Sequence, residues 1–316
     1  MSFSTATNEH LIRSNLWSTR LKEVLLDELF ATKFVDIITD FPDGDTLNIP
    51  SIGQAEVQDY VENAAVRYTA MDTGNFTFTI DQYKSTATYI TEKMKQDSYV
   101  MGRLMASFVP KQHRAIAKEM EVKVLDVGPT AQTASNLNTI NGGDHRFVAS
   151  GTNAVVQPKD FARANYALTM ANVPNTNRIA IVHPSVAFAL ETSTNITNVS
   201  NNPRWEGIIA SGISTGMRFI RNVYGFDVYE SQNLKLVGSE TINSVSVGAT
   251  GVANLFFSAT QDVLPFVGSI RQPPKVDSDY NKDLQREEYV TTCRYGYKLF
   301  RPENLVVVLS ATDQVS

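Results

Sequence analysis

The order of apolar and polar residues changes several times along the chain and predicts a mixture of helices and strands. Residues 15–30 place apolar side chains at helical spacing, with Asn15 as the N-cap, and predict an amphipathic helix. Residues 75–80 alternate phenylalanine and isoleucine with threonine, which is the period of a half-buried strand. Residues 97–125 carry apolar side chains three and four positions apart. They predict the longest helix of the chain, bent or restarted at Pro110.

The segment that precedes residue 80 predicts an extended arm. Residues 34–49 combine a short apolar run, a turn at residues 42–45 and a second strand, which indicates a hairpin. Between residues 47 and 80 the chain is strand-like but contains few residues suited to a core. We therefore predict a two-stranded arm closed by a loop between residues 53 and 72. Because an isolated two-stranded ribbon is only marginally stable in water, another surface must cover it.

The second half of the chain alternates between helical and strand patterns, after a region at residues 128–157 that we interpret as a loop. This alternation predicts α/β packing in a second region, and an α+β class for the whole chain. The expected elements are helices at 159–172, 184–191 and 205–222, strands at 178–182, 225–231 and 253–259, and a strand-rich end after residue 276.

Composition and charge exclude several classes of protein. With 316 residues, of which 42% are hydrophobic and 19% charged, the chain can bury a sizeable core and is typical of soluble globular proteins. The net charge is −5 and no run of lysine and arginine marks a phosphate-binding stripe, so any contact with DNA should be weak and independent of sequence. The first fifteen residues are polar, and no run reaches the roughly 18 apolar residues of a membrane span. We expect neither export nor membrane insertion.

A G-x-S-x-G sequence at residues 212–216 matches the nucleophile elbow of hydrolases and keeps a catalytic role for Ser214 open as an alternative. In that fold the histidine of the triad follows the serine in the chain, whereas the last histidine here is His183. The elbow also needs a strand immediately before it, where this sequence favours a helix. A turn or a helix contact made by small residues explains the motif better.

Metal and cofactor sites are not expected. No two histidines have the spacing of a metal pair, and Asp40, Asp43 and Asp45 lack the ligand spacing of an EF-hand and fit a hairpin turn. The only cysteine, Cys293, excludes an intrachain disulfide and a cysteine-based metal cluster and favours a reducing compartment. We predict that Cys293 is a buried strand residue. The chain therefore offers no active site, and we expect a protein that works by contact.

Three motifs occur in an order that resembles a known family. They are RIAIVHPSVAFAL (178–190), GFDVYES (225–231) and YGYKLFRPENLVVV (295–308). Together with the arm and the long helix, they resemble the major capsid proteins of tailed bacteriophages, whose Hong Kong 97-like fold also occurs in encapsulin nanocompartments and herpesvirus capsid floors. The resemblance covers nearly the whole chain. It implies an N-terminal arm (1–30), an extended β-hairpin loop (44–80), a peripheral domain with a long spine helix (31–43, 81–127 and 269–301) and an axial α/β domain (128–268 and 302–316).

The resemblance also implies a function and partners. The chain would assemble with itself, as hexamers and pentamers, into the icosahedral head shell that encloses the double-stranded DNA genome, and would have no enzymatic activity. A separate scaffolding protein, a portal protein and, in some shells, decoration proteins would be its other partners. Assembly would take place in the bacterial host cytoplasm, and the protein would end in the virion. An encapsulin-like cargo shell is the alternative with the same fold.

The candidate contact residues lie in the arm, the extended loop and the strand-rich end. We expect the strand at residues 286–300 to expose Arg294, Tyr295, Tyr297 and Lys298 to neighbouring subunits, after which Arg301 and Pro302 turn the chain into a buried strand. The hypothesis includes charge pairing between subunits, from Arg67 to the two consecutive glutamates. The candidates for contacts between subunits are Trp17, Leu21, Val57, Tyr60, Arg67, Tyr68, Glu287, Glu288, Arg294 and Tyr297.

Overall fold

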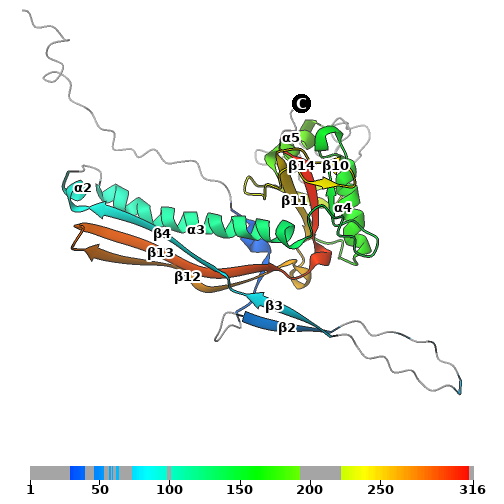
Figure 1. Ribbon diagram of the computed structural model, residues 1–316, viewed down its shortest axis with the longest axis horizontal. Helices are drawn as coiled ribbons and strands as arrows, with labels where there is room; N and C mark the ends of the chain where they lie inside the picture. Colours follow the sequence, from blue (N-terminus) through cyan, green and yellow to red (C-terminus); the bar gives the residue numbers. More distant parts are fainter. Residues whose placement is uncertain are drawn as a thin grey trace, which may run out of the picture.

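The computed structural model shows an elongated α+β molecule in which a long helix and a long sheet lead away from a second, more compact sheet (Figure 1). The α+β class expected from the sequence is confirmed. The described residues are 29–39, 46–52, 57, 59, 62–63, 73–97, 101–192 and 222–312.

The long sheet has four strands in the order β1-β12-β13-β4. Their bounds are Val35–Ile37 for β1, Phe266–Asn281 for β12, Arg286–Leu299 for β13 and Gln82–Thr91 for β4. One face of this sheet is covered by α3 (Met101–Ala131), which runs along it in Figure 1. Thr291 Oγ1 of β13 donates to Gln112 Oε1 of α3 at 2.8 Å, and Lys84 of β4 pairs with Glu119 of α3 at 2.8 Å. The helix therefore defines a near face and a far face of the sheet.

The prediction of a long helix is confirmed, but a restart at Pro110 is wrong. The helix continues as one element through both Pro110 and Pro129. A proline inside a helix removes one backbone hydrogen bond, and packing of the apolar face compensates for this loss. That face contributes Ile116, Met120 and Val124 to the core.

The compact sheet has six strands in the order β5-β14-β11-β6-β8-β7. Helices α4 (Pro158–Met170) and α5 (Pro184–Thr192) pack on one face, where Phe161 and Val186 meet strand residues such as Phe256. These elements confirm the predicted helices at 159–172 and 184–191 and the predicted strands at 178–182, 225–231 and 253–259. The strand bounds are Arg146–Val148 for β5, Val306–Ala311 for β14, Gly251–Ser258 for β11, Arg178–Val182 for β6, Phe226–Glu230 for β8 and Asn222–Val223 for β7.

Two predictions are wrong, namely the loop at residues 128–157 and the hairpin at residues 34–49. The region 128–157 contains the last turn of α3, strand β5 and the short helix η2 (Thr152–Ala154). Its many small and polar residues hid β5, because three residues are too few to show a period. The strand at residues 35–37 does not form a hairpin with the next strand. It pairs in parallel with β12, more than 200 positions away in the sequence, since β12 offers an open edge there.

Both sheets share one hydrophobic core. Val124 and Leu125 of α3, Leu255 of β11 and Leu309 of β14 belong to the same buried cluster. The short helix η1 (Ala31–Phe34) closes this junction. The backbone amides of Phe30 and Ala31 donate to the Glu121 carboxylate at 2.7 Å and 3.0 Å. The remaining elements are α2 (Glu92–Asp97), β9 (Thr241–Ile242), β10 (Val245–Ser246), η4 (Gln261–Val263) and η5 (Pro302–Asn304).

The Arg-Pro-Glu-Asn sequence turns the chain from one sheet into the other, as predicted. Asn304 accepts from the Ser258 amide at 2.8 Å and donates to the carbonyl oxygens of Ser258 and Val263 at 2.9 Å and 2.6 Å. These three bonds fix η5 against β11. The following strand β14 is buried over Val306–Ser310, which confirms the predicted closing strand.

Candidate functional site

A two-stranded ribbon, formed by β2 (Thr46–Ile52) and β3 (Thr73–Thr79), is a sheet of its own. Its antiparallel register pairs Leu47 with Phe78 and Ile49 with Phe76, so the apolar side chains share one face. The predicted strand at residues 75–80 is thereby confirmed. In Figure 1 the ribbon projects from the junction of the two sheets, in the direction opposite to the far tip of the long sheet.

The root of the ribbon is the part that its own subunit covers. Phe78 is buried together with Ile80 and Val267, and Phe76 packs edge-to-face on Phe300 with a centroid distance of 4.9 Å. Lys298 donates to the Thr77 carbonyl oxygen at 2.6 Å, with its Nζ 5.0 Å from the centroid of the Phe76 ring. Farther out, Asn48, Pro50, Gly74 and Asn75 are exposed.

The far face of the long sheet is the other extended surface. It is turned away from α3 and carries the odd-numbered residues of β4 and the even-numbered residues of β13. Tyr83 is 63% exposed and Tyr89 58% exposed, whereas their neighbours Lys84 and Ile90 point to the α3 side or into the core. Its members are Tyr83, Ser85, Ala87 and Tyr89 of β4 and Glu288, Val290, Thr292 and Arg294 of β13.

Sequence reasoning missed these two tyrosines. The segment QYKSTATYIT contains few apolar residues, and its small and polar side chains did not suggest a strand. The available signal was the two-residue period that places both tyrosines on one side. The pattern acquires meaning only when β13 pairs with β4 and α3 covers the opposite side.

The predicted exposure of two tyrosines in β13 is wrong. Tyr295 is fully buried and Tyr297 is 6% exposed, because both point toward the core shared with α3. Burial raises the pKa of both phenols well above the usual range. Arg294 is half-buried and Lys298 exposed, both on the far face. Tyr297 is therefore removed from the candidate contact residues.

The two consecutive glutamates of β13 have partners within the subunit. Glu287 pairs with Lys95 of α2 and accepts from the Tyr289 hydroxyl at 3.0 Å. The hydrogen bond from Lys95 lowers the pKa of Glu287. Glu288 accepts from Arg286 at 2.6 Å, and this bond lowers the pKa of Glu288. Both carboxylates thus help to order the far tip of the sheet, and pairing with another subunit would compete with these bonds.

The other predicted contact residues divide into two groups. Val57 is described and is 95% exposed. Five candidates lie outside the described residues, namely Trp17, Leu21, Tyr60, Arg67 and Tyr68. The predicted helices at 15–30 and 205–222 lie outside them too, except for residues 29, 30 and 222.

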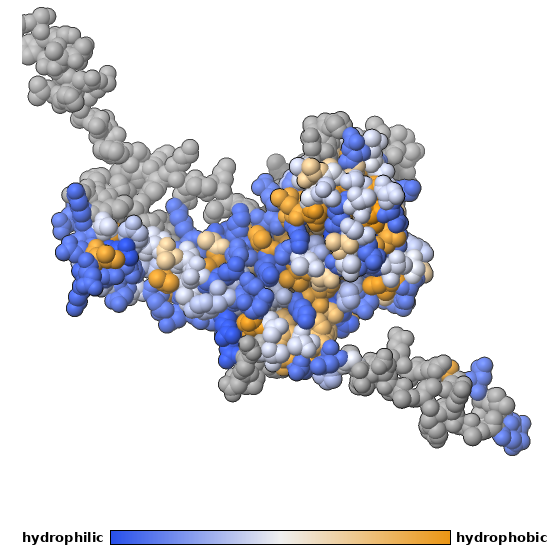
Figure 2. All heavy atoms as spheres, viewed as in Figure 1, coloured by the Kyte–Doolittle hydropathy of each residue, from blue (hydrophilic) through white to orange (hydrophobic). Residues whose placement is uncertain are grey.

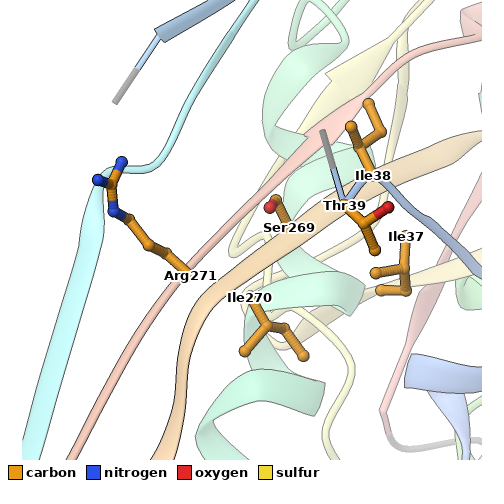
Figure 3. Close-up of a pocket in the computed structure, with 6 residues that line it drawn as sticks. All are labelled: Ile37, Ile38, Thr39, Ser269, Ile270 and Arg271. Carbon is orange, nitrogen blue, oxygen red and sulfur yellow. The ribbon is translucent and has the colours of Figure 1, made fainter. Parts of the chain in front are cut away.

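A hollow of about 180 Å³ lies where β1 ends beside β12 (Figure 3). Ile37 and Ile270 line it and are 45% and 38% exposed, and Thr39 and Ser269 add two hydroxyl groups. Arg271 points away from the isoleucines in Figure 3. The hollow offers apolar surface beside the root of the ribbon, which suits packing rather than chemistry.

The candidates for chemistry take structural places or fall outside the description. Cys293 is buried, as predicted, and donates to the Gln272 carbonyl oxygen at 3.2 Å. His145 is fully buried between the carbonyl oxygens of Gly143 and Glu303. His183 bonds to the Ser185 hydroxyl at 2.8 Å, and burial lowers its pKa. Ser214, Asp40, Asp43 and Asp45 lie outside the described residues.

In the described parts of the chain, no group of three or more histidine, cysteine, aspartate or glutamate side chains could hold a metal ion. Nor does any helix among those parts have the length and apolarity needed to cross a membrane. Figure 2 shows hydrophilic residues over much of the visible surface of the long sheet and α3, with hydrophobic residues gathered toward the compact sheet.

The fold is similar to those of solved phage capsids. A structure titled Mycobacterium phage Che8 has 19% identity and a TM-score of 0.67, over 94% of this chain and 97% of that chain. The capsid structure of the cyanophage P-SCSP1u has 15% identity and a TM-score of 0.69, over 97% and 94%. The mature capsid of bacteriophage PhiM1 has 10% identity and a TM-score of 0.69, over 94% and 91%. No curated protein matches the chain.

A family model connects the fold to a function. The model described as phage capsid protein matches residues 75–308, which include most of the ribbon strand β3, the strands of both main sheets except β1 and the end of β14, and the Arg-Pro turn. The match covers well over half of the chain. The chain therefore belongs to the phage capsid protein family and is a major capsid shell protein, a structural component of the virion.

Proposed function

We propose that this capsid protein is a Hong Kong 97-like subunit whose copies form the hexamers and pentamers of an icosahedral head shell around double-stranded DNA. In this proposal residues 44–80 are the extended loop, the long sheet with α3 is the peripheral domain, and the compact sheet with α4 and α5 is the axial domain. Residues 1–30 are the N-terminal arm. A separate scaffolding protein, a portal protein and decoration proteins are the further expected partners.

The observation that carries this proposal is that the ribbon leads away from its own subunit, while the far face of the long sheet remains exposed. The two strands of the ribbon lead in the direction opposite to the far tip (Figure 1), and Tyr83 and Tyr89 on the long sheet remain exposed. A two-stranded ribbon with exposed outer residues is marginal in isolation. In a shell of identical copies, the ribbon of one copy lies on the far face of the next, so that the ribbon is supported and the tyrosines are covered.

Chemistry on the far face suits such a contact. Tyr83 and Tyr89 provide large apolar rings with polar tips, and Val290 lies between them and β12. Tyrosines of this kind are enriched in protein interfaces. Arg294 stands beside Tyr83 in the β4–β13 register and adds a charged rim. Each contact is moderate alone, and repetition around a closed shell makes the sum large.

Deletion of residues 48–76 tests the assignment of the ribbon. We expect a folded and soluble subunit that forms no shells in electron micrographs, because among the described residues of this segment only Phe76 packs against a buried cluster, the small one at the root. Shells of wild-type size from this variant would contradict the proposal. Circular dichroism of the purified variant controls for folding.

A pair of tyrosine substitutions tests the far face. Tyr83→Asp is expected to prevent assembly, because a carboxylate replaces an aromatic ring in the contact. Tyr166→Asp is the matched control, since Tyr166 is 55% exposed on α4, far from the long sheet. Loss of shells in both variants, or in neither, would argue against the far face as the contact surface.

Family membership favours this function over the two alternatives. An encapsulin-like shell would use the same fold, but the matching family is described as phage capsid protein. A hydrolase that uses Ser214 has no support from the family or from the similar structures. Labelling of Ser214 by a fluorophosphonate probe would favour the hydrolase.

A further inference from the structure

The segment that joins the ribbon to β4 passes directly over Gly296 of β13. A β-carbon built on Gly296 would lie 2.7 Å from the Thr79 carbonyl oxygen and 2.9 Å from the Ile80 α-carbon. Both neighbours are backbone atoms of the segment that joins the ribbon to β4. Backbone atoms cannot swing aside as a side chain does, so any larger residue at this position displaces the whole crossing segment.

The crossing takes place on the far face. Residues alternate along β13, and its odd-numbered neighbours Tyr295 and Tyr297 point into the core on the α3 side. Gly296 therefore faces the other way, where Phe78 and Val267 form the small buried cluster at the ribbon root. The root of the ribbon thus covers one end of the far face and leaves the rest of this face open.

A second residue holds the ribbon two positions farther along β13. Lys298 donates to the Thr77 carbonyl oxygen at 2.6 Å, and its ammonium group lies near the ring of Phe76. Gly296 thus sets how closely the ribbon approaches the sheet, and Lys298 holds it at the next point. The packing of Phe76 on Phe300 and the burial of Phe78 hold the same root, and together these contacts define the direction of the ribbon.

We infer that Gly296 and Lys298 are positioning residues that set the direction of the ribbon and thereby decide whether, and at what curvature, subunits assemble. The inference rests on the proposed contact between the ribbon and a neighbour's far face. A small rotation at the root becomes a large displacement at the outer end of the ribbon. Because every copy in the shell has the same error, its effect on assembly multiplies.

The first experiment compares Gly296→Ala with Gly128→Ala in the full-length chain. A β-carbon on Gly128 would lie 2.6 Å from the Leu305 side chain in the main core, so this control introduces a similarly short contact, but with a side chain instead of the backbone that leads into the ribbon. We expect at least about tenfold fewer shells of wild-type diameter from Gly296→Ala, by electron microscopy. Gly128→Ala is expected to lower the melting temperature and to leave the diameter of the remaining shells unchanged.

A second measurement reports the direction of the ribbon itself. Spin labels on cysteines introduced at Asn75 and Asp279, both exposed, give a distance between ribbon and sheet in unassembled full-length subunits. We expect Gly296→Ala to shift this distance distribution, Lys298→Met to broaden it and Lys298→Arg to restore it, because arginine retains a donor. The lysine variants keep the test decisive if Gly296→Ala does not fold.

The outcomes separate this inference from the proposed function. If deletion of residues 48–76 leaves shell formation intact, the proposed ribbon contact itself fails. If that deletion abolishes shells while Gly296→Ala and Lys298→Met both give shells of normal yield and diameter, only the present inference is overturned. An unchanged distance distribution in both variants, with a loss of stability like that of Gly128→Ala, overturns it as well.

Discussion

Arg146 and Glu240 form a buried, two-pronged ion pair at the junction of the two sheets. Arg146 Nε lies 2.8 Å from Glu240 Oε1, and Arg146 Nη2 lies 2.6 Å from Glu240 Oε2. The third guanidinium nitrogen, Nη1, donates to the Pro129 carbonyl oxygen in the last turn of α3 at 3.1 Å. Glu240 also accepts from the Ser135 amide at 2.7 Å. One arginine thus joins β5, the end of α3 and the segment before β9.

Removal of one member of this pair is expected to be costly. Glu240→Ala leaves the guanidinium of Arg146 buried without its partner, and we expect a loss of about 3–5 kcal/mol in the free energy of unfolding. The double variant Arg146→Met with Glu240→Leu is expected to lose less than Glu240→Ala alone, because it buries no charge. Urea denaturation of the unassembled subunits measures both. Equal losses would show that packing, rather than the charge, matters at this place.

The same carboxylate predicts how stability depends on pH. Burial by itself would raise the pKa of Glu240, but the hydrogen bonds from Arg146 and Ser135 and the charges of Arg146 and Lys235 hold it below its ordinary value. A group whose pKa is lower in the folded state stabilises the fold above its unfolded pKa, and this stability is lost as the pH falls. We therefore expect stability to decline below about pH 4.5, the ordinary range of a glutamate. In Glu240→Gln the decline is expected to be smaller, and an identical pH profile would contradict the assignment.

Cys293 is expected to be inert in the folded protein. Its side chain is fully buried in β13, and burial raises the pKa of the thiol. Because the thiolate is the reactive species, a thiol reagent should label Cys293 only as fast as the subunit opens. Ser85→Cys on the exposed far face provides the control, and we expect rapid labelling there. Rapid labelling of Cys293 in the native subunit would contradict the buried position.

Two prolines interrupt the open edge of the long sheet. The edge strand β12 pairs with β1 only at residues 266–268. Its register with β13 shifts between Ile270 and Gln272 and again between Gln272 and Lys275, and the second shift spans Pro273 and Pro274. Proline has no amide to donate, and bulges twist an edge away from other strands.

Replacement of these prolines is expected to cause association of a disordered kind. Pro273→Thr with Pro274→Val adds two amide donors, and because successive N–H groups of a strand point to opposite sides, one of them faces the open edge. We expect irregular aggregates, measured by light scattering of fresh subunits. Lys282→Thr with Asp283→Val, in the turn after β12, is the control for added surface hydrophobicity. Similar aggregation in both pairs would show that the edge is not protected by the prolines.

Much of the local structure follows from the sequence alone. The predicted helices that became α4 and α5, and the strands β6, β8 and β11, lie where period and proline position indicated. The lack of core residues in the ribbon also follows from composition, as does the turn at Arg301 and Pro302. These features depend on neighbours within a few positions, which is the range over which a pattern carries information.

The faces of the long sheet were decided by tertiary structure. Tyr83, Tyr89, Tyr295 and Tyr297 are chemically equivalent, but the first two are exposed and the last two are buried. Alternation alone states that neighbouring residues differ in side, and it does not state which side is covered. That choice was made when α3 packed on one face, through contacts such as Thr291 to Gln112, 179 positions apart.

The sequence by itself determined the class of the fold, the main local elements and a ribbon too poor in apolar residues to be stable alone. Only the tertiary structure decided which surfaces remain exposed for contact with other subunits, and that Glu287 pairs with Lys95 and Arg146 with Glu240. The physical reason is that helix and strand periods are local properties, whereas burial and ion pairing depend on segments that meet only after folding.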